Sequence, residues 1–290
     1  MLGKNYPIQD NEVIKKFYYK NSVNLSIRLS SWKTYGTNKQ TLNDWIWSLI
    51  NPDPAAHKFA YSILDVGCGT GEMLASFKKC QKNLSTYGVD ISAAMIKRAA
   101  HKNRWAKQNF ILSDAAILPF KTSSFHITTA IFVLHHVANR LGVIRELVRV
   151  TKKNGIIIVA DGDYNVRNGL NAVHYAAIRK LHFPGFMNDS MTYLASSKKH
   201  IGDALNRLRL KNDGHIYKNR MVFHKVSPVL RYYASAMMYR NSSGPKDKRI
   251  SPELWQKLFN EVKNMVHSQI RRGGKFEIPG NVYCYLIHKG

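Results

Sequence analysis

The sequence predicts an α/β protein built on a mostly parallel β-sheet. From Ile63 to Asp161, short apolar segments alternate with segments of helical periodicity, and this alternation is typical of βαβ units with right-handed crossovers. The segment 155–160, GIIIVA, is apolar throughout, as expected of a strand covered on both faces. Three glycines follow the first strand directly, at the edge where parallel sheets bind their ligands.

The expected elements follow this alternation along the chain. Helices are expected near 10–24, 37–50, 71–82, 92–102, 136–150, 168–182, 197–210, 228–240 and 251–271. Strands are expected at 63–66, 86–90, 109–113, 125–133, 155–160, 214–223 and 281–288. We therefore expect an N-terminal helical segment (1–56) that partly covers the ligand site at the glycines, and a main domain (57–290). Helices near 162–212 and 225–275 would cover the substrate.

Composition indicates a folded, globular protein. The 290 residues are 44% hydrophobic, which is enough for one large domain with an elaboration. The N-terminus lacks the apolar core of a signal peptide and no window is long and apolar enough to span a membrane, so we expect a soluble, cytoplasmic protein. The three cysteines, Cys68, Cys80 and Cys284, are too few and too scattered for a disulfide framework or a zinc site, and no metal is expected.

The charge is strongly positive. Lys and Arg number 44 against 18 Asp and Glu, a net charge of +26. Such a surface attracts nucleic acid, anionic lipid or an anionic substrate. The alternative is a generally Lys-rich proteome, and both remain open because no Arg-rich tract or aromatic-studded basic repeat accompanies the charge.

The glycine loop reads Gly67-Cys68-Gly69-Thr70-Gly71. A P-loop would end in Gly-Lys-Ser/Thr, which is missing here. A dinucleotide fingerprint would place its third glycine one residue later, where Glu72 stands. An anionic side chain at that point disfavours a pyrophosphate, so the loop favours a ligand without phosphate. Cys68 is explained by the need for a small side chain.

Two aspartates extend the pattern. Asp90 ends the next strand, about 20 residues after the glycines, where a carboxylate can accept both ribose hydroxyls of an adenosine. Asp114 ends the strand after that and can accept from an adenine amino group, while the N–H of Ala115 can reach a ring nitrogen. Taken singly, Asp90 could be a helix N-cap and Asp114 a turn residue. Together with the glycines, they favour S-adenosylmethionine.

The chain resembles the class I S-adenosylmethionine-dependent methyltransferases, particularly the ubiquinone/menaquinone-methyltransferase-like branch. The resemblance covers residues 61–161 and is carried by ILDVGCGTGEM, YGVDIS, SDAAILPF, VLHHV and ELVRVTKKNGIIIVAD. It implies a Rossmann-like fold with seven strands, the last antiparallel, which NVYCYLIHK could supply. Two departures are His126, where the family usually has Asp, and Lys153-Asn154-Gly155 in place of Pro-Gly-Gly.

The resemblance also implies the residues of the cofactor site. Asp65, Gly67 and Gly69, with Cys68 in the same loop, would surround the methionine part. Asp90 would bind the ribose, Ile91 would lie against the adenine, and Asp114 with Ala115 would meet the adenine edge. The remaining residues implied are Phe132 and Leu134 as pocket lining and, from the segment 30–47, Tyr35 or Trp32 over the cofactor. Alternatively, these last two aromatic side chains anchor a helix on the core.

Three residues after the fourth and fifth strands are candidates for a catalytic base. His135 and His136 follow the fourth strand, and Asp161 follows the fifth. A histidine titrates near neutral pH and a carboxylate can orient it. Either histidine could instead cap or pack the following helix. An amine or an enolised carbon would need no base.

Three functions compete. The favoured one is methylation of a small molecule, anionic or aromatic. The Tyr, Met and Arg side chains of residues 227–240, an aromatic stripe, would cover this molecule. Alternatively, the stripe packs in the core. The second is methylation of tRNA or rRNA, since basic clusters at 207–220, 246–249 and 270–275 could follow a phosphate backbone. The third is a methyltransferase-like partner subunit without catalysis. The sequence gives no basis for an oligomeric state.

Overall fold

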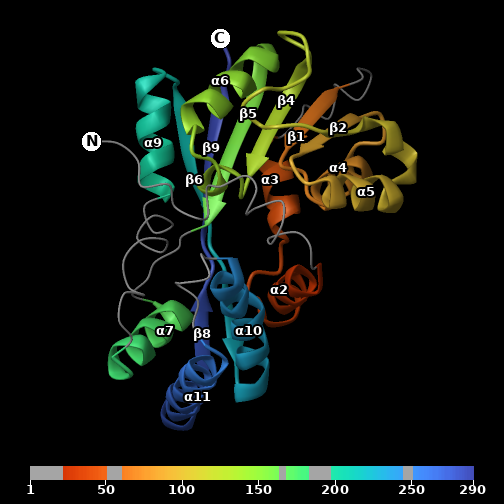
Figure 1. Ribbon diagram of the computed structural model, residues 1–290. Helices are drawn as coiled ribbons and strands as arrows, with labels where there is room; N and C mark the ends of the chain where they lie inside the picture. The colour runs from red at the N-terminus through yellow and green to blue at the C-terminus, as the bar shows by residue number, and fades with distance from the viewer. Residues whose placement is uncertain (1–21, 51–60, 163–167, 183–196, 244–250) are drawn as a thin grey trace. The chain divides into compact units, whose positions relative to one another are not determined.

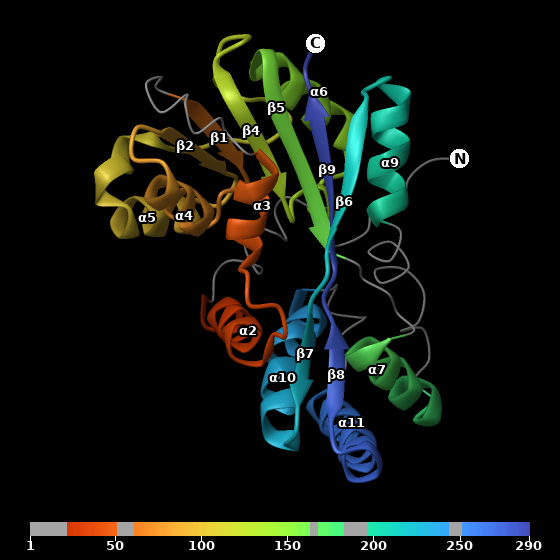
Figure 2. The same ribbon diagram turned by 180° about the vertical axis from the view of Figure 1, so that it is seen from behind.

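The computed structural model describes residues 22–50, 61–162, 168–182, 197–243 and 251–290. The chain divides into two compact units, and it passes from one to the other several times. Unit 1 is drawn from Met1–Lys39, Asp163–Ser196 and Lys218–Asn281, and unit 2 from Gln40–Gly162, Ser197–Tyr217 and Val282–Gly290. Each unit has its own sheet and its own buried core (Figures 1 and 2).

Unit 2 contains a seven-stranded sheet in the order β3-β2-β1-β4-β5-β9-β6. The strands are β1 (Ser62–Val66), β2 (Ser85–Asp90), β3 (Phe110–Leu112), β4 (Phe125–Ile131), β5 (Thr151–Gly162), β6 (Asn212–Tyr217) and β9 (Val282–His288). Strands β1 to β5 pair in parallel, whereas β9 runs antiparallel to β5 and to β6. The expected mostly parallel sheet is confirmed, and the segment NVYCYLIHK supplies its antiparallel strand.

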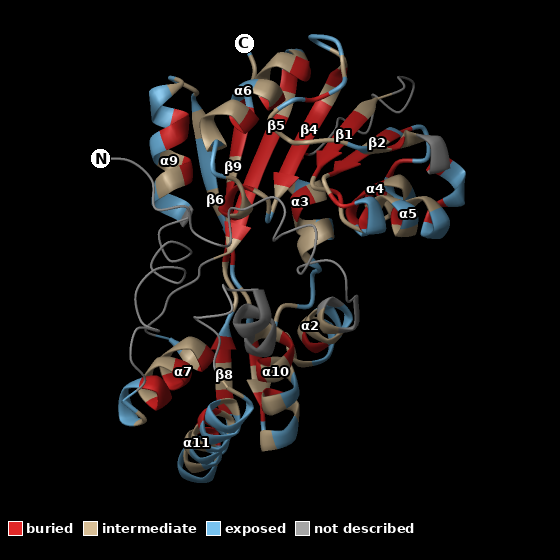
Figure 3. Cartoon of the chain, in the orientation of Figure 1, coloured by how far each residue is buried: buried red, intermediate tan, exposed pale blue. Residues whose placement is uncertain are grey.

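Helices cover both faces of this sheet (Figures 1 and 2). On one face lie α3 (Leu42–Ile50), α4 (Glu72–Cys80) and α5 (Ala93–Lys102); on the other lie α6 (Arg140–Val150) and α9 (Ser197–Arg207). Short 3-10 helices occupy Arg104–Asn109 (η4) and Leu134–His136 (η5). The strands between the two layers are buried along much of their length (Figure 3). No helix in the described ranges has the length and apolar character that a membrane-spanning segment requires.

In the described part of unit 1, four helices pack around a small antiparallel sheet. Its elements are α2 (Ser22–Tyr35), α7 (Gly169–Lys180), β7 (Arg220–Phe223), α10 (Val226–Ser243), α11 (Pro252–Gly273) and β8 (Phe276–Pro279). Tyr233 is fully buried in its core, where the ring stacks on Trp255 at a centroid distance of 5.7 Å. The Tyr233 hydroxyl lies 2.8 Å from Nδ1 of His174, so this buried polar group is satisfied.

The expectation of a single strand at 214–223 is wrong. The segment forms β6 and β7, which belong to different sheets and different units. Asn219 stands at the break: its Oδ1 accepts the N–H groups of Thr37, Asn38 and Arg220 at 2.9 to 3.1 Å. No Gly or Pro stands between Tyr217 and Arg220, so the sequence gives no strong signal of the break. The sequence also gave no sign of β8, which has only four residues.

The structure tests only one of the two expected N-terminal helices, and it shows a helix, α2, largely over residues where the sequence predicted none. The helix expected at 10–24 falls almost entirely outside the described residues, and α2 begins at Ser22. The helix expected from residue 37 is α3, and its cap is Thr41, whose hydroxyl oxygen accepts the N–H of Asp44 at 3.2 Å. The apolar face of α3 packs on the core of unit 2: Ile46 is buried, and Leu42, Trp45 and Leu49 pack against the same core.

Candidate functional site

The glycine loop of unit 2 turns sharply between β1 and α4. Gly67, Gly69 and Gly71 have φ angles of 75°, 53° and 74°, a region that glycine enters without the penalty that other residues incur. The N–H groups of Gly67 and Cys68 both donate to the carbonyl oxygen of Val89, at 2.7 and 2.9 Å. The loop is therefore held against the carboxyl end of β2.

The first two glycines have different surroundings. A Cβ atom on Gly67 would lie 2.3 Å from Cγ2 of Val133, so packing excludes a side chain there. A Cβ atom on Gly69 would meet no described atom within 4 Å. One end of the loop is thus packed tightly, and the next glycine leaves room for a ligand beside the backbone.

Alanine substitutions should separate these two roles. We expect Gly67→Ala to lower the free energy of unfolding by about 3 kcal/mol, because an unfavourable φ and a steric clash combine. Gly69→Ala should lower it by only about 1 kcal/mol, while its methyl group obstructs the ligand. Urea denaturation and calorimetric ligand titration of both variants measure the two effects. Equal losses of stability would contradict the packing at Gly67.

Two buried carboxyl groups lie beside the loop, at the ends of β1 and β2. Thr129 Oγ1 donates to Oδ1 of Asp65 at 2.8 Å. Asp90 accepts the N–H of Gly69 on Oδ2 at 2.9 Å and that of Ser92 on Oδ1 at 2.8 Å. Within the described part of the chain, neither carboxyl is paired with a Lys or Arg side chain. In a chain of net charge +26, this site is acidic and suits a cationic ligand.

Burial raises the pKa of both carboxyl groups. The pKa of Asp65 rises from 3.8 to about 7, because desolvation and the nearby Asp90 outweigh the hydrogen bond from Thr129. Desolvation also raises the pKa of Asp90, against the hydrogen bonds from the backbone. A cation bound here would favour the charged forms and would therefore lower both pKa values.

The raised pKa of Asp65 makes stability depend on pH. The folded-state pKa of about 7 exceeds the ordinary value of 3.8, so the ligand-free protein loses stability as pH rises between these values. Asp65→Asn removes this loss and should be more stable than the wild type at pH 8, by at most roughly 4 kcal/mol. The difference should shrink toward zero near pH 4. Urea denaturation across this range measures it, and a pH-independent difference would contradict the argument.

The edge of the sheet also exposes apolar side chains. Leu112 at the end of β3, Ile117 in the next loop and Phe132 after β4 are 56%, 77% and 38% exposed. Phe132 has a φ of 58°, which is a strained conformation for a bulky residue, and such strain clusters at functional sites. Ile91, which follows β2, is half-buried. These side chains offer an apolar surface for a planar group.

Asp114 and Ala115 lie in a tight turn after β3. Oδ1 of Asp114 accepts the N–H of Ala116 at 2.8 Å, so Asp114 organises this turn, which is the alternative role that the sequence allowed. Ala115 is half-buried against the core. The turn begins where Ser113 donates its N–H to the carbonyl oxygen of Asp90, at 3.1 Å. The structure therefore brings the two predicted adenosine-binding aspartates to neighbouring points of one edge.

Three other predicted cofactor residues have packing contacts. Cys68 is buried and packs closely on Gly88, where an added Cβ atom would lie 2.8 Å from the Sγ of Cys68. Leu134 is buried in the core beneath α6 and α9. Tyr35 belongs to unit 1 and packs on Phe223 at a ring-centroid distance of 4.5 Å. Their contacts with a cofactor stay predictions.

The structure brings His135 and Asp161 together. Nδ1 of His135 lies 2.9 and 3.0 Å from the two carboxylate oxygens of Asp161, and both residues are buried. The N–H of Gly162 donates to Oδ1 of Asp161 at 2.8 Å. With the proton on Nδ1, the carboxylate holds the ring and leaves Nε2 as a proton acceptor. The ring of His136 lies 3.9 Å from that of His135, centroid to centroid.

The sequence did not predict two other polar residues near the site, Thr129 and Arg140. Thr129 reaches Asp65 because β1 and β4 pair in a register that places them side by side, and no local pattern reveals that register. Arg140 donates from Nε to the carbonyl oxygen of Leu134 at 2.9 Å. Burial lowers the pKa of Arg140, and the charge of Asp161 opposes that fall. Among the described residues, no group of three or more His, Cys, Asp or Glu could hold a metal ion.

Comparisons with known proteins find similarity to methyltransferases. Residues 64–159 match the family model described as "Methyltransferase domain". The ubiquinone/menaquinone biosynthesis C-methyltransferase UbiE of Campylobacter jejuni is 30% identical over 115 residues, which are 38% of this chain and 48% of that protein. The demethylmenaquinone methyltransferase of Thermotoga maritima is 32% identical over 99 residues, 34% of this chain and 42% of that protein. The chain spans less than half the length of these relatives.

Solved structures share the fold. Phosphoethanolamine N-methyltransferase 2 of Haemonchus contortus, in complex with S-adenosyl-L-methionine, aligns with a TM-score of 0.56 and 13% identity. The alignment covers 99% of this chain and 60% of that one. Residues 64–159 of unit 2 match a methyltransferase domain.

At the two places where the chain departs from the family pattern, His126 and Lys153-Asn154-Gly155, the residues present are compatible with the fold. Nδ1 of His126 accepts the N–H of Ser62 at 3.0 Å and so ties the start of β4 to β1. Asn154 has a φ of 60°, which asparagine tolerates better than most residues. A Cβ atom on Gly155 would lie 2.8 Å from the carbonyl oxygen of His126, so the retained glycine is required. Both departures lie at the opposite end of the strands from the glycine loop.

Proposed function

We propose that the protein transfers the methyl group of S-adenosylmethionine to a small-molecule acceptor. The observation that carries the proposal is the pair of buried carboxyls, Asp65 and Asp90, beside a glycine loop with room for a ligand. S-adenosylmethionine carries a sulfonium and an ammonium group and no phosphate, so its charge complements these carboxylates. ATP or a dinucleotide would bring negative charge to the same place.

The residues present fit this cofactor. Asp90 would accept the ribose hydroxyls, and Asp65 with the backbone of Gly67 and Gly69 would hold the methionine part. Ile91 and Phe132 would flank the adenosine, while Asp114 and the N–H of Ala115 would meet the adenine edge. The cofactor supplies an activated methyl group. The protein supplies binding, orientation and exclusion of water.

We further propose that His135 acts as the base and that Asp161 orients it. A hydroxyl or carbon acceptor loses a proton when it takes the methyl group, and a histidine can accept that proton near neutral pH. Support comes from the two short contacts between Nδ1 of His135 and Asp161. An amine or an enolised carbon would react by proximity alone.

A small-molecule acceptor is supported by the relatives' names. They describe quinone-biosynthesis enzymes. An RNA acceptor rests on the net charge of +26 and on the basic clusters at 207–220, 246–249 and 270–275.

Labelled methyl transfer tests the proposal. The protein is incubated with methyl-labelled S-adenosylmethionine and cell extract, and the products are separated into RNA and small molecules. We expect label in the small-molecule fraction and its loss in the Asp90→Ala variant. Label in RNA would overturn the acceptor class, and an absence of label from every fraction would overturn methyl transfer.

A further inference from the structure

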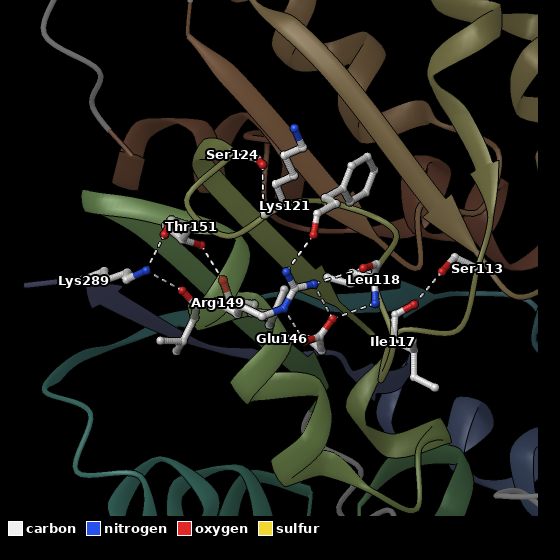
Figure 4. Close-up of polar contacts among 12 residues, drawn as sticks. Ser113, Ile117, Leu118, Lys121, Ser124, Glu146, Arg149, Thr151 and Lys289 are labelled. Atoms are coloured by element: carbon white, nitrogen blue, oxygen red, sulfur yellow. Dashed lines mark hydrogen bonds and ion pairs between the residues drawn. The ribbon is translucent and has the colours of Figure 1, made fainter.

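Two charged residues of α6 form a clamp that the proposed methyl transfer does not use. Glu146 and Arg149 are three positions apart and therefore lie on one face of the helix. Arg149 donates from Nε to Oε1 of Glu146 at 2.6 Å and from Nη2 to Oε2 at 2.8 Å (Figure 4). This paired geometry fixes the direction of both side chains. Arg149 also holds the pKa of Glu146 below its ordinary value, so the carboxylate is charged at neutral pH.

The clamp binds the loop between β3 and β4 through three hydrogen bonds (Figure 4). Oε2 of Glu146 accepts the N–H of Leu118 at 2.7 Å. Arg149 donates from Nη2 to the carbonyl oxygen of Leu118 at 3.0 Å and from Nη1 to that of Phe120 at 2.7 Å. Since both polar groups of Leu118 are bound, this part of the backbone can neither rotate nor slide without breaking charged hydrogen bonds.

The other end of the loop is tied to β2. Ser113 donates its N–H to the carbonyl oxygen of Asp90 at 3.1 Å and its hydroxyl to that of Ile117 at 3.0 Å. Between these anchors lies the turn at 114–117, closed by the N–H of Ile117 on the carbonyl oxygen of Asp114 at 3.1 Å. The position of this turn therefore depends on both the β2 anchor and the clamp.

We propose that Glu146 and Arg149 are positioning residues that set the adenine specificity of the cofactor site. The inference rests on the proposed function, in which Asp114 accepts from the adenine amino group and the N–H of Ala115 donates to a ring nitrogen. Both groups stand on the turn between the two anchors. A loosened clamp allows the turn to shift, so the two groups no longer discriminate between purines.

The test compares S-adenosylhomocysteine with S-inosylhomocysteine by calorimetric titration. The inosine base carries an oxygen in place of the adenine amino group, so it presents an acceptor to Asp114 instead of a donor. We expect the wild type to prefer the adenosyl ligand by at least about tenfold, because the rejected base leaves polar groups unpaired. Arg149→Lys and Glu146→Gln should reduce this preference to below about threefold. Arg145→Lys, an exposed position on the same helix, is the matched control and should keep it.

The affinity ratio separates positioning from stability. If the clamp served stability alone, the two substitutions would lower the folded fraction and leave the affinity ratio of the folded protein unchanged. An unchanged affinity ratio in both variants therefore overturns the proposal. Should Arg149→Lys fail to fold, Glu146→Gln, which keeps the side chain's shape, carries the test. Failure of the wild type to bind either ligand overturns the proposed function itself. Wild-type binding without a preference overturns only the adenine specificity.

Discussion

Replacing Asp90 with alanine is expected to abolish binding of S-adenosylmethionine, with a loss of affinity of at least about 100-fold. Two hydrogen bonds from ribose hydroxyls to a charged group are worth roughly 1.5 to 3 kcal/mol each. The substitution also removes the acceptor of the N–H groups of Gly69 and Ser92, so the glycine loop loses its tie to β2. Calorimetric titration with S-adenosylhomocysteine measures the change.

Two further variants control this result. Asp90→Asn keeps the shape of the side chain and removes its charge, so it should bind more weakly than the wild type and more tightly than Asp90→Ala. Asp213→Ala removes an exposed carboxylate on β6 and should bind as the wild type does. Undiminished binding by Asp90→Ala would remove the central inference about the site.

The second large effect is expected at the His135–Asp161 pair. His135→Gln should lower kcat by about 10²- to 10⁴-fold, the usual contribution of a positioned base, with cofactor affinity nearly unchanged. Asp161→Asn should act in the same direction, because an asparagine no longer favours the tautomer with the proton on Nδ1. Steady-state kinetics at saturating cofactor, together with calorimetric titration, separate the two quantities.

His136→Gln is the matched comparison for this prediction. His136 adjoins the pair, but the contact with Asp161 belongs to His135, so His136→Gln should reduce kcat much less. A wild-type kcat in His135→Gln would show that the acceptor needs no base. An equal fall in both histidine variants would contradict the assignment of the base to His135.

The sequence predicted those parts of the site that local signals encode. The glycine loop, Asp90 and Asp114 each lie at or just beyond the carboxyl end of a strand, and the parallel sheet brings these strand ends together without further information. His135 and Asp161 follow the same rule on β4 and β5. The residue pattern therefore sufficed to place these side chains at one edge.

Tertiary register accounts for what the sequence did not predict. Thr129 contacts Asp65 only through the pairing of β1 with β4, and the break between β6 and β7 depends on the distant partners of Asn219. The i, i+3 spacing of Glu146 and Arg149 was visible, but their hold on Leu118 depends on how α6 packs. For Tyr233, burial in the core of unit 1 matches the packing role that the sequence allowed for the aromatic stripe.

A crystal structure with S-adenosylhomocysteine tests the central claim most directly. The account predicts the ribose hydroxyls on Asp90, the amino-acid part along Gly67 and Gly69, and the adenine between Ile91 and the turn at Asp114. The homocysteine sulfur should face the side of the site where His135 and Asp161 lie. A ligand bound elsewhere, or an adenosine that makes no contact with Asp90, would contradict it.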